Sequence, residues 1–283
     1  MKIFIFSDTS WSLGRVHRDV MKQLNHEVQY LNWGNYNWYD FVNAYTWCDK
    51  CITNLVSYRT LKNSFPQFDL KKCIFVSHGF IEHENMEYDM NMTYGMTSDS
   101  ISDLFPLEIK PFLMPNGVDP ENFNYIPKDG TLLNLGWCGA EHIWWKQSSW
   151  GKYLSDKTNI HLKVATKLSY DELKEWYNTI DLLVVTALPN AHQETGPLPP
   201  FEAIVSGVPA IGTPVGNFRN VPGPKFTTLE DGVAIINYYK ENPEELKKLA
   251  REQYDFVINN YSYKVLAPLW EKALTTENGN SQV

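Results

Sequence analysis

Two glutamates stand eight positions apart in the segment HQETGPLPPFEAIVSGVPAIGTPVG, which covers residues 192–216. Glu194 and Glu202 lie on either side of a Gly-Pro-Leu-Pro-Pro run, and the small and apolar residues that follow predict a helix. A carboxylate accepts hydrogen bonds from two hydroxyls at once, which suits the vicinal diol of a sugar. The first turn of a helix offers unpaired amides and a partial positive charge to phosphate oxygens.

Two chemical interpretations of this pattern remain open. With phosphates at the helix start near Pro199, Glu202 would hold a ribose diol and Glu194 the hydroxyls of a second sugar. A sugar on each side of a diphosphate describes a nucleotide-sugar. Pro199 and Pro200 suit the first helical turn, and Gly196 lets a ligand approach the backbone closely. Alternatively, both carboxylates only favour solvent and the positive end of a helix, and their spacing does not decide between the two.

Short apolar runs alternate with helical patterns along the chain, which predicts parallel strand–helix–strand units. We expect strands at 2–6, 27–31, 73–77, 94–97 and 112–114, and then at 132–136, 161–165, 181–186, 208–212 and 233–236. A helix is expected at 16–24, and another begins at Ser98 or Ser100. Ser169 opens a further helix with the Ser-x-x-Glu spacing of a capping box, and later helices are expected from 199, at 243–259 and at 263–274.

The polar stretch 119–130, which contains proline and glycine, is the expected boundary between two halves of similar size. The predicted class is therefore α/β, with two Rossmann-like domains whose parallel sheets face a cleft. The N-terminal domain would cover 1–126 and the C-terminal domain 127–262. A last helix and a frayed tail would occupy 263–283.

Composition and charge narrow the function classes. The 283 residues are 43% hydrophobic, which supports a substantial core, and the net charge of −8 without a long basic run argues against extended nucleic-acid binding. The opening residues MKIFIFSDTS indicate a strand and not a signal peptide, and no apolar run reaches ~18 residues. We expect a cytoplasmic protein, with peripheral membrane contact left open. Cys48 and Cys51 have CxxC spacing but lack a second pair of ligands, so no metal site is expected.

Several segments resemble, in the same order, the retaining GT-B glycosyltransferases of family 4. The stretch ETGPLPPFEAIVSGVPAIGTPVG is similar to the glutamate-x7-glutamate motif of that family. Other resembling segments are YGMTSDSISDLF, MPNGVDPENF, LGWCGAEHIWWK, YDELKEWYNTIDLLVVT and YSYKVLAPLWEKAL. The resemblance covers most of residues 73–275. It implies a GT-B fold with an unusually short N-terminal acceptor domain, a C-terminal nucleotide-sugar domain and a last helix that crosses back to the N-terminal domain.

The same resemblance implies the chemistry. A sugar would pass from a UDP-, GDP- or ADP-sugar, the co-substrate, to an acceptor hydroxyl with retention of the anomeric configuration. No bound metal or other cofactor would be needed. The leaving phosphate would itself accept the proton of the acceptor hydroxyl.

The resemblance also assigns residues. Catalytic roles fall to Glu194 near the reacting carbon of the donor sugar, to Lys146 on the diphosphate and to His78 near the donor sugar. The implied donor-binding residues are Glu202 on the ribose, the backbone of Thr195, Gly196, Pro197 and Leu198 on the sugar and phosphates, Thr166 beside the base, and Gly14 in the first strand-to-helix loop.

This sequence departs from the family pattern at two places. The first strand-to-helix loop carries a single glycine, whereas the family usually has several. Trp137 follows Gly136 where many members carry an arginine, which leaves Lys146 as the main basic group. Arg15 and Arg219 are candidates to compensate.

Three functions remain open on the sequence alone. The first is an enzyme that acts on a glycan, a lipid-linked sugar or a small molecule. The second is a glycosyltransferase for modified DNA bases, which the acidic charge disfavours. The third is a non-catalytic protein that binds a nucleotide-sugar or a glycan. The aromatic segment WGNYNWY at 33–39 follows the second predicted strand and is the candidate acceptor site, because aromatic faces stack on sugars.

Overall fold

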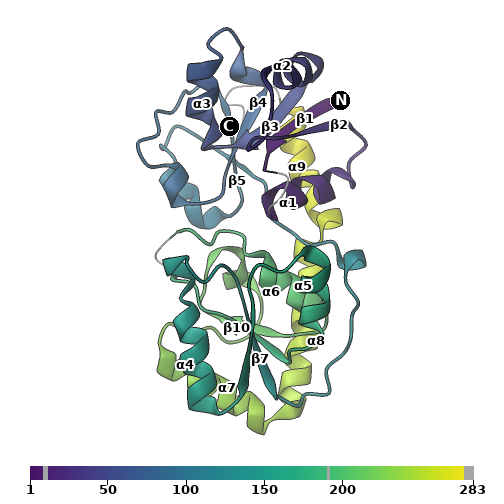
Figure 1. The fold of residues 1–283 in the computed structure, drawn as a ribbon, viewed down its shortest axis with the longest axis vertical. Helices are drawn as coiled ribbons and strands as arrows, with labels where there is room; N and C mark the ends of the chain where they lie inside the picture. Colours follow the sequence, from purple (N-terminus) through teal and green to yellow (C-terminus); the bar gives the residue numbers. More distant parts are fainter. Residues whose placement is uncertain (9–11, 190–191, 277–283) are drawn as a thin grey trace. The chain divides into compact units, whose positions relative to one another are not determined.

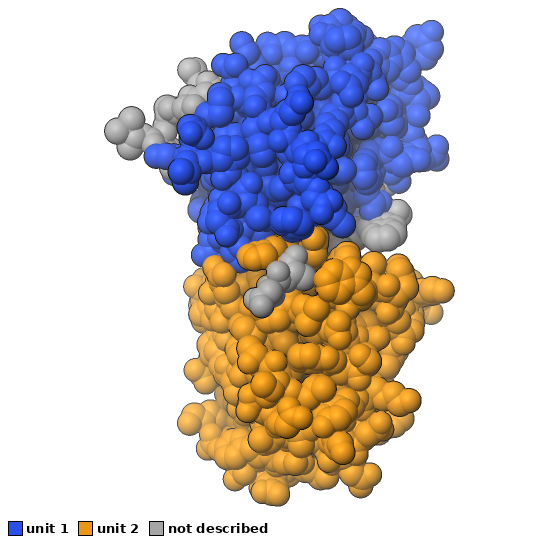
Figure 2. Space-filling model, turned by 90° about the vertical axis from the view of Figure 1, so that its left-hand side faces the viewer, with its two compact units in different colours: residues 1–117, 263–283 blue, residues 118–262 orange. Residues whose placement is uncertain are grey.

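The computed structural model describes residues 1–8, 12–189 and 192–276. The chain divides into two compact units, which Figure 1 shows as ribbons and Figure 2 in two colours. Unit 1 comprises Met1–Gly117 and Tyr263–Val283, and unit 2 comprises Val118–Ser262. The chain therefore first passes between the units just before the polar stretch 119–130.

Unit 1 is built on a six-stranded parallel sheet with the order β2-β1-β3-β4-β5-β6. The central strands are almost continuously apolar, as in KIFIFS and CIFVS, because helices and loops cover both faces of a parallel sheet. The strands are β1 (Lys2–Ser7), β2 (Glu27–Asn32), β3 (Lys50–Asn54), β4 (Cys73–Ser77), β5 (Thr93–Met96) and β6 (Phe112–Leu113).

The helices of unit 1 contact the sheet and one another. Phe4 and Phe6 of β1 pack with Phe41 of α2 (Trp38–Trp47). The last helix, α9 (Tyr263–Thr275), packs against α1 (Ser12–Met21), and its buried Trp270 donates a hydrogen bond of 3.2 Å to the carbonyl of Pro115. The remaining helix is α3 (Ser57–Ser64). Apolar packing thus fixes the C-terminal helix to unit 1, although it follows unit 2 in the chain.

Unit 2 contains a four-stranded parallel sheet with the order β10-β9-β7-β8. The strands are β7 (Asn134–Cys138), β8 (His161–Ala165), β9 (Leu182–Val185) and β10 (Ala210–Gly212). Alternate residues of β9 belong to different cores: Leu183 and Val185 to one, Leu182 and Val184 to the other. The sheet is therefore buried on both faces.

Five helices supply those two cores. On one side α4 (Ser148–Thr158) packs against α7 (Leu229–Glu241). On the other, α6 (Leu198–Val205) packs against α5 (Tyr170–Tyr177) and α8 (Pro243–Tyr261). The helix α5 opens with the predicted capping box, in which Ser169 and Glu172 exchange hydrogen bonds.

The structure confirms the predicted α/β class with parallel sheets, and most predicted strands lie within two residues of their observed bounds. The strand expected at 233–236 is wrong, because these residues lie inside α7. Gly232, Ile236 and Tyr239 are its buried residues, which is a helical spacing. The elements β3, α2, α3 and α4 were not predicted. Within the described ranges, no helix is long and apolar enough to cross a membrane.

Candidate functional site

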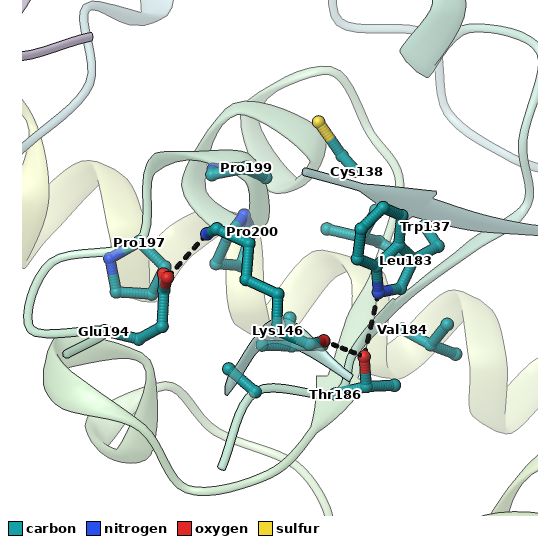
Figure 3. A pocket seen from close by; sticks show the side chains of 12 residues that line it. Trp137, Cys138, Lys146, Leu183, Val184, Thr186, Glu194, Pro197, Pro199 and Pro200 are labelled. Carbon is teal, nitrogen blue, oxygen red and sulfur yellow. Dashed lines mark hydrogen bonds and ion pairs between the residues drawn. The ribbon is translucent and has the colours of Figure 1, made fainter. Parts of the chain in front are cut away.

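A pocket in unit 2 lies at the carboxyl ends of β7 and β9 and at the start of α6 (Figure 3). Ligands of open parallel sheets bind beyond this edge. The lining residues include two of the predicted catalytic residues, Lys146 and Glu194, and one predicted donor-binding residue, Pro197. The others are Trp137, Cys138, Leu183, Val184, Val185, Thr186, Ala187, Pro199 and Pro200.

Lys146 and Glu194 form an ion pair inside this pocket. The Lys146 ammonium lies 2.5 Å from Oε1 of Glu194, and the indole N–H of Trp145 donates to the same oxygen at 3.1 Å. The Lys146 side chain is 25% exposed and that of Glu194 is 14% exposed. A ligand that enters the pocket therefore meets a cation and an anion side by side.

Thr186 fixes the segment that carries Lys146. Thr186 is the residue directly after β9. Its hydroxyl donates to the backbone carbonyl of Lys146 at 2.8 Å and accepts a hydrogen bond from the indole N–H of Trp137 at 2.8 Å. The backbone N–H of Leu188 donates to the carbonyl of Trp145. Trp137, which stands where the resembling family carries an arginine, is therefore a buried wall of the pocket and supplies no charge to it.

The loop before α6 is packed against a glycine that sequence reasoning did not single out. Gly216 has φ +41°, and a Cβ atom there would lie 2.1 Å from the carbonyl oxygen of Thr195 and 2.3 Å from that of Glu194. The backbone N–H of Asn217 donates to the same Thr195 carbonyl at 2.9 Å. In the sequence, the Val-Gly pair that ends the segment 192–216 was the available signal for this contact. Only glycine lets another stretch of backbone come so close.

The start of α6 offers fewer amide donors than an ordinary helix start. The four residues that would present unpaired amides begin at Pro197 and continue with Leu198, Pro199 and Pro200. Proline has no N–H, so only Leu198 of these four can donate. A phosphate at this tip would depend more on Lys146 and on the amides of Thr195 and Gly196.

Glu202 lies deeper than its partner glutamate. It is the fifth residue of α6, beyond the first turn in which we expected it, and it is only 3% exposed. The hydroxyl of Tyr177, at the end of α5, donates to its Oε2 at 2.8 Å. Glu202 is not among the residues that line the pocket of Lys146 and Glu194.

Two further predicted residues lie outside this pocket. Thr166 is partly exposed directly after β8, whose Ala165 carbonyl accepts the N–H of Gly139 beyond β7. Gly14 lies in the first turn of α1 and not in the strand-to-helix loop, so that expectation is corrected. Residues 9–11 of that loop lie outside the described residues.

His78 directly follows β4 in unit 1 and is partly exposed. Desolvation, together with His17 at a ring-centroid distance of 6.3 Å, lowers the pKa of His78 to about 3. Burial lowers the pKa of His17 to about 4. Both imidazoles are therefore neutral near pH 7, and His78 would act on a ligand through hydrogen bonding rather than charge.

No family model and no curated protein matches the sequence, but solved structures match nearly the whole chain. HepE from Anabaena, solved with UDP and glucose, has a TM-score of 0.70 at 11% identity, covering 97% of this chain and 99% of its own. Sucrose-phosphate synthase from Thermosynechococcus elongatus has a TM-score of 0.69 at 10% identity, covering 96% and 98%. The DNA-modifying enzyme β-glucosyltransferase, whose substrate is uridine diphosphoglucose, has a TM-score of 0.65 at 11% identity, covering 98% and 100%. This likeness shows that the chain has the GT-B fold, with one α/β unit after the other.

Proposed function

We propose that unit 2 binds a nucleotide-sugar and that the protein is a retaining, metal-independent glycosyltransferase. The observation that carries this proposal is the pairing of Lys146 with Glu194 in a pocket at the carboxyl edge of a parallel sheet. The ammonium suits a diphosphate, and the carboxylate suits sugar hydroxyls. The shared fold with the UDP-bound HepE supports the same donor class and makes UDP-sugars the first to test.

In the proposed reaction the acceptor oxygen forms a bond to the anomeric carbon of the donor sugar. The bond from that carbon to the diphosphate oxygen breaks, and the nucleoside diphosphate leaves with the electron pair. The leaving phosphate takes the proton of the acceptor hydroxyl. Lys146 stabilises the negative charge that develops on the leaving group, as a positioned cation does in other phosphate-leaving reactions.

The other site residues keep the roles that the resemblance implies. Glu194 holds hydroxyls of the transferred sugar. Glu202 binds the ribose through a carboxylate that the Tyr177 hydroxyl orients. The backbone of Thr195 and Gly196 meets the phosphates, because Pro197 begins a tip with few N–H donors.

A thermal-shift screen tests donor binding. A ligand that binds only the folded state raises the melting temperature. UDP-glucose, GDP-mannose and ADP-glucose are compared on the wild type, on Lys146→Ala and on Lys152→Ala, an exposed lysine of α4 that makes the same charge change away from the pocket. We expect one donor class to raise the melting temperature of the wild type and of Lys152→Ala but not of Lys146→Ala.

NMR of the product tests the sugar transfer itself. Incubation with the bound donor should yield a glycoside whose anomeric configuration equals that of the donor, and an inverted product would contradict the retaining assignment. No shift with any of the three donors would contradict the donor site. Binding without transfer or hydrolysis would instead assign a non-catalytic nucleotide-sugar-binding protein.

A further inference from the structure

A hydrogen-bonded series of side chains at the carboxyl end of β4 has no role in the proposed donor site. Glu82 ends the short 3₁₀ helix η2 (Phe80–Glu82), and its Oε2 accepts the backbone N–H of His78 at 2.6 Å. The hydroxyl of Ser77, the last residue of β4, favours the charged form of the same carboxyl and lowers its pKa. Ser77 Oγ also lies 2.7 Å from Nε2 of His83, and the Tyr88 hydroxyl bonds to Nδ1 of that ring.

His83 links Ser77 to Tyr88 through its two ring nitrogens. Desolvation lowers the pKa of His83 to about 4, so the ring is neutral near pH 7, and a hydrogen bond with the backbone of Leu104 acts in the opposite direction. A neutral imidazole donates from one nitrogen and accepts at the other, so it can bond to both hydroxyls at once. Tyr88 and His83 therefore hold Ser77 in place beside the carboxylate of Glu82.

Burial disfavours the charged form of the Glu82 carboxylate. Burial raises the pKa of Glu82 to about 7, in spite of the hydrogen bonds from His78 and Ser77, which act in the opposite direction. A further hydroxyl that donates to it would favour the charged form. The residue as a whole is nevertheless partly exposed.

Glu82 lies at the edge of the sheet where ligands of α/β units bind, beside exposed apolar side chains. β4 lies inside the sheet, between β3 and β5, and its carboxyl end is where α/β units bind ligands. Phe80 and Ile81, next to Glu82, are 41% and 56% exposed. Arg59 of α3 donates to the carbonyl of Glu84 at 2.9 Å, which ties this loop to the helix beside it. An apolar surface beside an oriented carboxylate matches a sugar, which has a C–H face and a rim of hydroxyls.

We propose that Glu82 hydrogen-bonds a hydroxyl of the acceptor, and that the acceptor is a glycoside whose apolar face or aglycone lies on Phe80 and Ile81. Ser77, His83 and Tyr88 are positioning residues that act through Glu82. This inference rests on the proposed function and names its second substrate.

The aromatic segment 33–39 is a weaker acceptor candidate. Trp38 stacks on Phe65 at 4.1 Å and on Phe41, so it belongs in part to the core of unit 1. The segment follows β2, an edge strand that β1 and β3 separate from β4.

The test measures binding of p-nitrophenyl glycosides of glucose, galactose, mannose and N-acetylglucosamine by saturation-transfer NMR and titration calorimetry, in the presence of UDP. The variants are Glu82→Gln, Tyr88→Phe and Glu84→Gln, the last being an exposed glutamate of the same loop. Removing a hydrogen bond to a charged group lowers the affinity roughly 10- to 100-fold. We expect that loss in Glu82→Gln, a smaller loss in Tyr88→Phe at similar melting temperature, and none in Glu84→Gln.

The outcomes separate this inference from the proposed function. Glu82→Gln should keep the rise in melting temperature that UDP-glucose or another donor gives the wild type, which also shows that the variant is folded. Equal glycoside affinity in Glu82→Gln and the wild type would overturn the inference, as would a wild type that binds no glycoside or binds only a short DNA duplex. The absence of any donor shift in the wild type would instead count against the proposed function.

Discussion

The ammonium of Lys146 and the carboxylate of Glu194 lie 2.5 Å apart, and each is the ligand-binding group proposed for a different part of one donor. Trp145 donates to the same carboxylate oxygen, so Glu194 is held from two sides by the turn η5 (Trp144–Lys146). Without a ligand, the Lys146 ammonium and the Glu194 carboxylate form an ion pair with each other. A diphosphate must therefore compete with Glu194 for the lysine.

This competition predicts opposite effects of Glu194→Gln on binding and on turnover. Loss of the carboxylate leaves the Lys146 charge to the phosphates, so UDP should bind with equal or several-fold higher affinity. Donor turnover should fall by roughly 100-fold, because the contact to the transferred sugar is lost. Calorimetry and a UDP-release assay measure the two effects, with Glu175→Gln on the exposed side of α5 as the control. Weaker UDP binding together with unchanged turnover would contradict the assigned roles.

Gly216→Ala should disrupt the loop that holds Glu194. The new Cβ would lie 2.1 Å from a backbone carbonyl, at a φ of +41° that side chains disfavour, so the backbone must move. We expect a loss of about 2–4 kcal/mol in the free energy of unfolding, measured in urea by tryptophan fluorescence, with UDP binding weakened as well. Gly34→Ala is the control, since its Cβ would meet only the side chain of Asn32 at 3.3 Å. Equal unfolding midpoints for the two variants would refute this role of Gly216.

Tyr177→Phe should act on Glu202. The variant removes the donor 2.8 Å from a carboxylate that is almost fully buried, which costs about 1–3 kcal/mol of stability. In the background of Glu202→Gln the same change should cost less, because the buried charge is gone, and the difference is the coupling between the two residues. Tyr238→Phe, on an exposed tyrosine of α7, provides the control. Additive effects of the two substitutions would show that the hydrogen bond does not orient Glu202.

Much of this architecture could be predicted because strong local signals specify it. Apolar runs such as CIFVS and HLKVA matched β4 and β8 residue for residue, and the Ser169 capping box matched the start of α5. The run VAII at 233–236 led to a wrong strand prediction, because β-branched residues favour strands. Tertiary packing instead places these residues in α7. β3 was missed because its segment KCITN is short and polar at both ends.

The candidate site was only partly readable, for a similar reason. The types and order of Glu194 and Glu202 are visible in the sequence, but their partners Lys146 and Tyr177 come from other elements. Lys146 and Glu194 are 48 positions apart and Tyr177 and Glu202 are 25 apart, so no local sequence pattern reveals these pairs. The Glu82 series was likewise hidden, although its residues lie within one segment, because only the fold of the loop after β4 brings Ser77, His83 and Tyr88 into line.

The buried histidine His17 should make unit 1 sensitive to acid. Its pKa is lowered to about 4 in the folded state, against 6.5 as the ordinary value, so between these values the unfolded chain binds a proton that the folded one does not. Stability is therefore fully present above pH 6.5 and is lost as the pH falls toward 4, by up to about 1.4 kcal/mol per pH unit. His17→Phe should make this fall in melting temperature shallower, with the rest coming from His78, whereas His161→Phe on the exposed end of β8 should not change it. Parallel pH curves for the wild type and His17→Phe would contradict the assignment.

The prolines at the start of α6 lead to a prediction in which a substitution improves binding. Pro199 lines the pocket but cannot donate, so Pro199→Ala adds one N–H where a phosphate oxygen is expected. One hydrogen bond to a charged phosphate oxygen corresponds to about 1.5–3 kcal/mol, so the UDP affinity measured by calorimetry should rise roughly 10- to 100-fold. Pro243→Ala at the start of α8 makes the same change in chain flexibility away from the pocket and should leave UDP affinity unchanged. If Pro199→Ala binds UDP no better than the wild type, the phosphates do not rest on the helix tip, and Lys146 with the loop amides must hold them elsewhere in the pocket.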